Sequence, residues 1–314
     1  MRRLGRWTGA ELIRLWKEDL GIDVTGLLDD RQVVGLWHAD KSDLRFFHPI
    51  VTGDEGFYAR LRRFGWYLQP DKWEYREAAR HIGAADAVLD LGAGAQAFRA
   101  FVAPGRYSAL DPYAPGAIGR QRPEGYDVVC AFQVLEHVAD PLALVAEAKA
   151  RLKPGGRLFL GVPRRDSYLA DLRDFALDLP PHHVTRWSRR ALETLAREAA
   201  LRIEAVEESP LEPWERPLYW MARLERRLPR PPRGRSRGAH LRLSRRARPL
   251  GGRRRTAVGR RRDAAPAGAG LIPGRSRYRF AQIGVSPPPR PSPLTREGWA
   301  GVTLRNLQVS TKAG

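Results

Sequence analysis

Short apolar runs and amphipathic stretches alternate through the middle of the chain. The apolar runs predict strands at residues 87–91, 107–110, 126–131, 157–162 and 201–207. The stretches between them carry apolar residues at helical spacing and predict helices at 97–102, 140–152 and 188–200. Strands that alternate with helices in this way form a parallel sheet with helices on both faces. We therefore predict an α/β fold with a mostly parallel sheet and a ligand at the carboxyl ends of its strands.

The N-terminal section, residues 1–70, has a different pattern and is predicted to be a helical, aromatic-rich cap that contacts the substrate. Helices are expected at 10–20, 53–64 and 71–82, with short β structure at 33–50. Asp71 is the expected N-cap of the third helix, and Gly83 is its expected C′ residue. The aromatic side chains are interpreted as the core of the cap, with a stacking platform for a substrate as the alternative.

Charge is distributed unevenly along the chain. The formal net charge is +20, yet residues 226–314 hold 23 of the 55 Lys and Arg residues and only two of the 35 acidic ones. Residues 1–225 are therefore almost neutral. A near-neutral domain offers no basic groove for a phosphate backbone, which disfavours a nucleic-acid substrate.

Residues 229–314 are dominated by Arg, Pro and Gly and show no persistent strand or helix period. Such a composition cannot bury enough apolar surface to offset the entropy of ordering, so a disordered basic tail is predicted. One interpretation is a basic arm for RNA or an anionic membrane. The preferred one is out-of-frame translation of GC-rich DNA, in which case residues 278–285 are the only tail segment able to imitate the domain's final strand.

An amphipathic helix is predicted just before the tail, at residues 215–230. Its apolar side chains are opposed to several arginines. A packed terminal helix with a solvated face is the preferred interpretation, and a basic helix on a membrane surface is the alternative.

The cysteine and histidine patterns exclude several kinds of site. The single cysteine, Cys130, rules out an internal disulfide and a cysteine-based zinc site. None of the seven histidines lies in a linear ligand spacing such as HExxH, so no metal is expected. The sequence shows no secretory leader and no charge-free apolar run of about 18 residues, the length that spans a bilayer. A soluble cytoplasmic protein is the expectation.

The first central strand runs into a glycine-rich turn, D-L-G-A-G-A-Q-A at residues 90–97. Gly92 and Gly94 let a ligand approach the backbone closely. The glycine spacing alone also fits a dinucleotide site. Asp90 separates the two interpretations, because a carboxylate at this point repels a pyrophosphate but suits a cofactor with a cationic amino end.

Together with three later segments, this turn resembles the class I S-adenosylmethionine-dependent methyltransferases of the small-molecule branch. The four segments are V-L-D-L-G-A-G at 88–94, A-L-D-P at 109–112, Y-D-V-V-C-A-F-Q-V-L-E-H-V at 126–138 and L-K-P-G-G-R-L-F-L-G-V-P at 152–163. The resemblance implies a Rossmann-like domain, placed at 71–228, with S-adenosyl-L-methionine as the cofactor.

The resemblance also implies which residues bind the cofactor. They are Asp90, Gly92, Gly94, Asp111, Phe132, Gln133 and Val134. The first three would surround the aminocarboxypropyl end. Asp111 would accept hydrogen bonds from both ribose hydroxyls, a task for an acceptor-only carboxylate. Residues 132–134 would lie beside the methionine sulfur, mostly through their main chain.

Two features depart from the family pattern. Gln96 stands where a third glycine is common and is expected to narrow the space for the cofactor. The short interval at 112–125 lacks room for the usual helix, strand and adenine-contacting acid, so no adenine-binding residue is named. These departures leave a non-catalytic binding protein with the methyltransferase fold as one alternative. An RNA methyltransferase that uses the basic tail is the other.

Three histidines are the candidates for the acceptor side of the reaction. Methyl transfer is an in-line displacement that depends on alignment, and a base is needed only if the acceptor loses a proton. His137, just past the third strand, is the candidate catalytic residue, with capping of the turn as an equal alternative. His182 and His183 resemble a segment that lines the acceptor pocket in related enzymes, with backbone hydrogen bonding as the alternative. The predicted acceptor is a small molecule or a glycan- or lipid-linked precursor, and the oligomeric state is left open.

Overall fold

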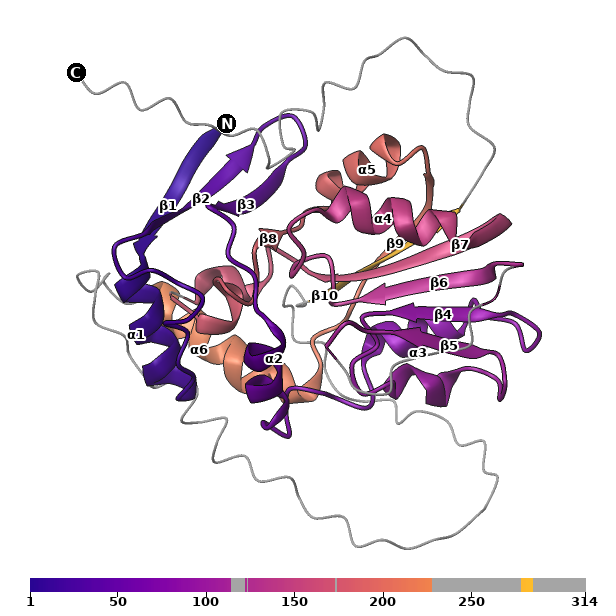
Figure 1. Ribbon diagram of the computed structural model, residues 1–314, viewed down its shortest axis with the longest axis horizontal. Coiled ribbons are helices and arrows are strands. Elements are labelled where there is room, and N and C mark those ends of the chain that lie inside the picture. Colours follow the sequence, from indigo (N-terminus) through magenta and orange to yellow (C-terminus); the bar gives the residue numbers. More distant parts are fainter. Residues whose placement is uncertain (114–121, 123, 173, 228–277, 285–314) are drawn as a thin grey trace, which may run out of the picture.

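The structure is a computed structural model that describes residues 1–113, 122, 124–172, 174–227 and 278–284. Its strands form a six-stranded sheet and a smaller four-stranded sheet (Figure 1). The large sheet carries the elements from the middle of the chain, and the small sheet belongs mostly to the N-terminal section.

The large sheet has the strand order β5-β4-β6-β7-β10-β9. Its strands are β4 (Val88–Leu91), β5 (Tyr107–Leu110), β6 (Tyr126–Phe132), β7 (Leu152–Pro163), β9 (Arg202–Glu208) and β10 (Tyr278–Gly284). The pairs β4–β5, β4–β6 and β6–β7 are parallel, whereas β10 runs antiparallel to both of its neighbours. The predicted α/β fold with a mostly parallel sheet is confirmed.

Helices cover both faces of this sheet. α4 (Pro141–Ala150) and α5 (Arg189–Glu198) pack on one face, and α3 (Trp73–Ala79) with the 3-10 helix η1 (Ala97–Phe101) packs on the other. Side chains alternate along β4, so Leu89 joins the core under α4 and α5 while Val88 joins the core under α3.

The helix starts show which sequence signals were correct. Asp140 accepts a hydrogen bond from the Ala143 N–H at 3.0 Å and caps α4 as the Asp-Pro pair predicts. The predicted caps of α3 are wrong: Lys72 is its N-cap residue, and the helix ends at Ala79, well before Gly83. Asp71 instead pairs with Arg76, a contact that draws it away from the helix N-terminus.

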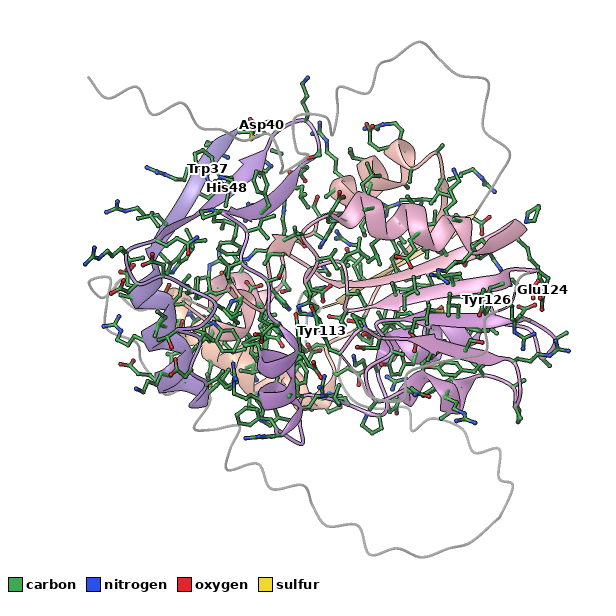
Figure 2. All side chains as sticks on the ribbon, in the orientation of Figure 1. Trp37, Asp40, His48, Tyr113, Glu124 and Tyr126 are labelled. Atoms are coloured by element: carbon green, nitrogen blue, oxygen red, sulfur yellow. The ribbon has the colours of Figure 1, made fainter. Side chains whose placement is uncertain are left out.

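The N-terminal section is only partly helical. It contains α1 (Gly9–Leu20) and α2 (Glu55–Arg62), but also β1 (Arg2–Thr8), β2 (Val33–Ala39) and β3 (Leu44–His48), which pair antiparallel. The strand β8 (Thr185–Arg186) lies much later in the sequence, and it completes this small sheet by pairing with β3. Figure 2 shows Trp37 and His48 on the sheet and Asp40 at its end. β1 was not predicted because it is largely exposed and has no buried alternation.

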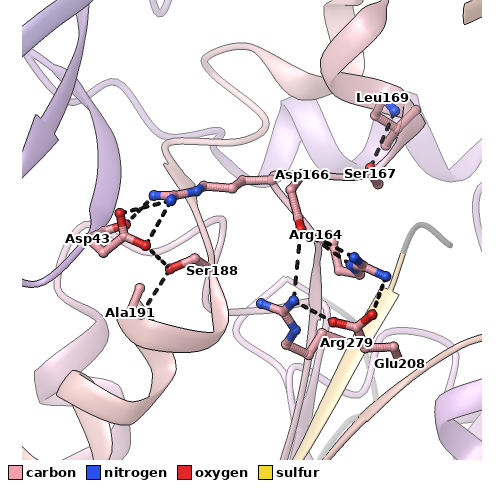
Figure 3. Close-up of polar contacts among 10 residues, drawn as sticks. Asp43, Arg164, Asp166, Ser167, Leu169, Ser188, Ala191, Glu208 and Arg279 are labelled. Carbon is pink, nitrogen blue, oxygen red and sulfur yellow. Dashed lines mark hydrogen bonds and ion pairs between the residues drawn. The ribbon is translucent and has the colours of Figure 1, made fainter. Parts of the chain in front are cut away.

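β10 corrects the prediction that residues 229–314 are disordered throughout. It lies between β7 and β9, where Phe280, Ala281 and Ile283 are fully buried. Arg279 is also buried and pairs with Glu208, with 2.6 Å between Nη2 and Oε1 (Figure 3). The reason is local, since this apolar segment can fill the gap between two strands whatever the composition around it. Residues 228–277 and 285–314 lie outside the described ranges, so the basic-arm and out-of-frame interpretations stay predictions there.

α6 (Arg216–Arg227) corresponds to the helix predicted at 215–230. Tyr219 and Ala222 are buried, and the ring of Tyr219 packs against that of Tyr168 with 5.9 Å between the centroids, which confirms a packed helix. Trp220 and Leu224 are 58% and 59% exposed on its outer side, and the membrane-surface interpretation stays a prediction. Within the described ranges, every helix is too short or too polar to cross a bilayer.

Candidate functional site

A cavity of about 1060 Å³ opens at the carboxyl ends of β4, β5 and β6, against the N-terminal section. Its wall is formed by the glycine turn, the end of β5, the loop after β6 and several aromatic side chains. The loop that carries His182 and His183, called the histidine loop below, completes the wall. Figure 2 shows Tyr113 between α2 and the large sheet, where its ring stacks on Tyr58 with 5.3 Å between the centroids. This location agrees with the ligand position expected for a parallel sheet.

The glycine turn after β4 forms one side of the cavity. Gly92 and Gly94 both have positive φ angles, +70° and +51°, which side chains rarely tolerate. At Gly92 an added Cβ would lie 2.5 Å from Cγ2 of Val134, so only glycine fits there. The Gly92 N–H donates to the Leu110 carbonyl at 2.7 Å, which ties the turn to the end of β5.

Asp111 follows β5 and faces the same cavity. Its Oδ2 accepts a hydrogen bond from the Gly94 N–H, and its Oδ1 accepts one from the Tyr113 N–H, both at 2.8 Å. Two backbone donors thus fix the carboxylate, and each oxygen retains a lone pair for a further donor. The structure brings Asp111 and the glycine turn together, and the contact with ribose stays a prediction.

Asp90 lies outside the cavity wall, on the α3 face of the sheet. Its side chain is buried, and Oδ2 accepts a hydrogen bond from the Tyr107 hydroxyl at 2.7 Å. Burial raises the pKa of Asp90 to about 7, although the Tyr107 hydrogen bond favours the carboxylate. The Tyr107 hydroxyl is thus the side-chain partner of Asp90 in the structure, and the contact of Asp90 with the aminocarboxypropyl end of a cofactor stays a prediction.

A different buried acid, Glu74, lines the cavity and was not predicted. It lies in the first turn of α3, and its Oε1 accepts a hydrogen bond from Nε2 of Gln133 at 3.3 Å. Lys72, the N-cap residue of the same helix, also lines the cavity. An acid in the first turn of a helix is common on electrostatic grounds alone, so the sequence position of Glu74 does not mark it as a cavity residue.

The loop after β6 turns sharply at the cavity. Phe132, Gln133 and Val134 all line it, as predicted for residues near the reacting end of a cofactor. Gln133 has a φ of +59°, an unfavourable conformation for a residue with a side chain, and such conformations concentrate at functional sites. Its N–H donates to the Gly161 carbonyl of β7 at 2.8 Å, which holds the turn in place.

Ala95 and Ala97 line the cavity whereas Gln96 between them does not, and the expected narrowing of the cofactor space stays a prediction. The φ of +57° at Gln96 explains why glycine is common at this position, since the chain is left-handed there. The second departure, the short 112–125 interval, falls partly outside the described residues. Among those that are described, β5 is the edge strand of the large sheet.

Three histidines from two loops meet at the cavity wall. His137 follows β6, and His182 and His183 precede β8. The ring of His137 lies 4.5 Å from that of His182 and 5.1 Å from that of His183, between centroids. The rings of His182 and His183 are stacked at 4.5 Å. From the sequence, His137 is predicted as the catalytic residue and the other two as acceptor-binding residues. In the fold the three side chains form one cluster.

Each histidine of this cluster has its Nδ1 beside an oxygen. His137 Nδ1 lies 2.7 Å from the His182 carbonyl, and His182 Nδ1 lies 2.8 Å from the Leu177 carbonyl. His183 Nδ1 lies 3.1 Å from Oδ1 of Asp178. Carbonyl and carboxylate oxygens only accept, so each neutral ring carries its proton on Nδ1 and a lone pair on Nε2.

Burial keeps the centre of the cluster neutral. It lowers the pKa of His137 to about 4, despite the hydrogen bond to the His182 carbonyl. The hydroxyl of Tyr67 lies 3.0 Å from Nε2 of His182, and it donates because that nitrogen has no proton. His182 thus bonds backbone, as the alternative interpretation held, and still faces the cavity.

Some aromatic residues of the N-terminal section form its core, and others face the cavity, where a stacking platform for a substrate was the alternative interpretation. Phe46, Phe47 and Phe57 are fully buried core residues. Tyr58, Tyr67, Phe64 and Trp66 line the cavity. Burial raises the pKa of the Tyr58 and Tyr67 hydroxyls above their usual range, so both stay neutral.

The chain is similar in sequence to known methyltransferases. Residues 59–206 match a family described as a methyltransferase domain. A ubiquinone biosynthesis O-methyltransferase of Xanthomonas euvesicatoria is 32% identical over 109 residues, which cover 31% of this chain and 44% of the relative. The Nitrosospira multiformis protein of the same name is 34% identical over 98 residues, covering 29% and 41%. The chain thus spans less than half the length of these curated relatives.

Solved structures with a similar arrangement include two methyltransferases. A 1,6-didemethyltoxoflavin-N1-methyltransferase of Burkholderia thailandensis aligns with 82% of this chain and 96% of its own, at a TM-score of 0.40 and 13% identity. An S-adenosylmethionine-dependent methyltransferase of Mesorhizobium loti aligns with 69% of this chain and 100% of its own, at a TM-score of 0.40 and 12% identity.

Proposed function

Residues 59–206 form a methyltransferase domain of the class I S-adenosylmethionine-dependent family, and on that premise we propose that the protein methylates a hydroxyl group of a small-molecule or glycan- or lipid-precursor acceptor. One observation carries the proposal. A single cavity combines the glycine turn and Asp111 on one side with the three-histidine cluster on the other. The O-methyltransferase names of the curated relatives support a hydroxyl acceptor.

The cofactor side of the cavity fits S-adenosylmethionine. Gly92 and Gly94 leave room for close approach to the backbone, and Asp111 presents a fixed carboxylate for paired hydroxyl donors. Glu74, buried in the wall beside Gln133, supplies an acid for a cationic amino end in addition to Asp90. When bound, the cofactor supplies a methyl group on a sulfonium, which is electrophilic without further activation.

The acceptor side is formed by the histidine cluster and the aromatic residues. A neutral imidazole with a lone pair on Nε2, as at His137, can hold the hydrogen of an acceptor hydroxyl and orient its oxygen. His137 follows directly from the β6 loop, so it is the catalytic residue we propose, with His182 and His183 as acceptor-binding residues. Tyr58 and Trp66 add flat apolar surface that excludes water and aligns the acceptor for in-line attack.

The test is calorimetry of the full-length protein with S-adenosylhomocysteine. We expect one site per chain and a loss of affinity of about tenfold or more for Asp111→Asn, since hydrogen bonds to a charged group contribute about 1.5–3 kcal/mol. Asp30→Asn, a change at an exposed acid, is the matched control and should bind as the unmodified chain does.

Two results would contradict the proposal in different ways. A folded chain that does not bind S-adenosylhomocysteine would remove the cofactor assignment altogether. Binding with no methyl transfer to a panel of phenols, catechols and sugar alcohols would favour the non-catalytic alternative. Gln96, one of the two departures that motivated that alternative, lies away from the cavity wall.

A further inference from the structure

The three cavity histidines have the arrangement of ligands around a metal ion. Nitrogen atoms of His137, His182 and His183 all lie within 4.8 Å of one another. In a tetrahedral site with metal–nitrogen bonds of about 2.0–2.1 Å, ligand nitrogens are separated by about 3.3 Å. The nitrogens are thus near that separation, and because the rings of His182 and His183 are stacked, one of these rings has to turn before both can point at a single ion.

The hydrogen bonds at Nδ1 are those expected behind metal-bound imidazoles. Histidine ligands usually donate their second N–H to a carbonyl or carboxylate, which fixes the ring and directs the other nitrogen at the metal. His137 and His182 donate to backbone carbonyls, and His183 donates to Asp178. Asp178 is itself held by Arg186, with 2.9 Å between Nη2 and Oδ2. With Nδ1 engaged in this way, Nε2 is the nitrogen that each ring can offer to an ion.

The surroundings balance the charge of a divalent cation. Glu136 is 1% exposed, and its Oε1 lies 3.9 Å from Nε2 of His137. Asp178 stands behind His183 on the opposite side of the cluster. Two carboxylates next to three neutral imidazoles offset a double positive charge, which burial would otherwise penalise heavily.

We propose that His137, His182 and His183 bind a divalent transition-metal ion, most naturally Zn²⁺, through their Nε2 atoms. Imidazole suits zinc and its neighbours in the first transition row, and three protein ligands leave a fourth position open. That position faces the cavity, beside the loop after β6. The hydroxyl of Tyr67, now on Nε2 of His182, turns aside when the ion binds.

The inference rests on the proposed function for its role in the reaction, and in the metal-bound form the ion, rather than a histidine Nε2, holds the acceptor oxygen. An acceptor hydroxyl at the open position becomes more acidic, because the cation stabilises the oxyanion. Its proton passes to solvent, the oxygen forms a bond to the methyl carbon, and the carbon–sulfur bond breaks with its electron pair left on sulfur. The products are a methyl ether, S-adenosylhomocysteine and the released proton. Acceptors with two adjacent hydroxyls would be favoured, since both oxygens can reach one ion.

Metal binding is tested on the full-length protein independently of methyl transfer. Chelator-treated protein is titrated with Zn²⁺, and with Co²⁺ to record its visible absorption. We expect about one ion per chain and Co²⁺ bands typical of a tetrahedral site. His182→Gln and His183→Gln should each lower Zn²⁺ affinity by at least about tenfold, and Asp178→Asn by about 10- to 100-fold through the orientation of His183. His81→Gln, at a histidine that follows the end of α3 and pairs with Glu77, is the matched control and should leave affinity unchanged.

The outcomes separate this inference from the proposed function. Folded protein that takes up less than about a tenth of an equivalent of Zn²⁺ overturns the metal site, as do His182→Gln and His183→Gln variants that bind like the unmodified chain. Circular dichroism on each variant shows whether it is folded, and Asp178→Asn tests the site without removing a ligand. Binding of S-adenosylhomocysteine is measured on the same samples. Cofactor binding without metal uptake defeats the metal site alone, and metal uptake without cofactor binding defeats the proposed function alone.

Discussion

At the scale of single residues, two buried acids near the glycine turn have different surroundings. Asp90 is enclosed on the α3 face of the sheet with the Tyr107 hydroxyl as its partner. Glu74 is equally buried but borders the cavity. Burial raises the pKa of Asp90 to about 7, so this carboxyl gains or loses its charge near neutral pH. Its effect on stability is therefore strongly dependent on pH.

The Asp90 carboxyl should make the folded protein less stable as pH rises. Its folded pKa of about 7 lies above the ordinary value of 3.8, so its favourable contribution is complete below about pH 4 and is lost as pH rises through 7. Asp90→Asn removes this dependence and keeps an acceptor for Tyr107. We expect similar stability for both proteins near pH 4 and an advantage of about 2–4 kcal/mol for the variant at pH 8, measured by urea unfolding. Equal stability at both pH values would show that the carboxyl is not desolvated.

At the scale of elements, the cofactor side of the cavity could be predicted from sequence motifs, whereas the histidine cluster on the acceptor side could not. The glycine turn, Asp111 and residues 132–134 follow strands in order, so their motifs could be recognised along the chain. The histidine cluster joins loops 45 residues apart, and Tyr67 lies 115 residues from His182. No linear spacing encodes such a meeting. It depends on the fold, in which Trp16 of α1 anchors the histidine loop by donating to the Pro180 carbonyl at 2.8 Å.

The short helix α3 delivers Glu74 to the cavity, and this can be tested within the helix itself. Glu74→Gln should weaken binding of S-adenosylhomocysteine by about tenfold, because the variant loses the charge that faces the cationic amino group. Glu77→Gln, one turn further along α3 and paired with Arg80 and His81, is the matched control and should bind normally. Calorimetry on both variants checks the prediction. If both changes have the same effect, Glu74 acts through the helix rather than on the cofactor.

At the scale of the whole molecule, the large sheet is completed by a strand from far along the chain. β9 has no direct partner in the large sheet other than β10 among the described strands, so β10 connects it to β7. The composition of residues 229–314 predicted disorder because Arg, Pro and Gly outweigh apolar residues over the segment as a whole. An average over 86 residues conceals seven that fit a sheet. A chain ending near residue 228 would therefore lack part of the methyltransferase core.

Phe280 gives the sharpest test of this architecture. Its side chain is fully buried and lies 5.3 Å from Phe159 and 6.4 Å from Trp73, between ring centroids. Phe280→Ala leaves a cavity at the contact of β10, β7 and α3, and we expect a loss of about 3–5 kcal/mol in the free energy of unfolding. Val33→Ala, at a side chain that is 45% exposed, should change the stability by less than about 0.5 kcal/mol. Chemical unfolding of both variants in the full-length chain measures the difference. If the segment around Phe280 were unstructured, both substitutions would be equally harmless, and the large sheet would end at β7.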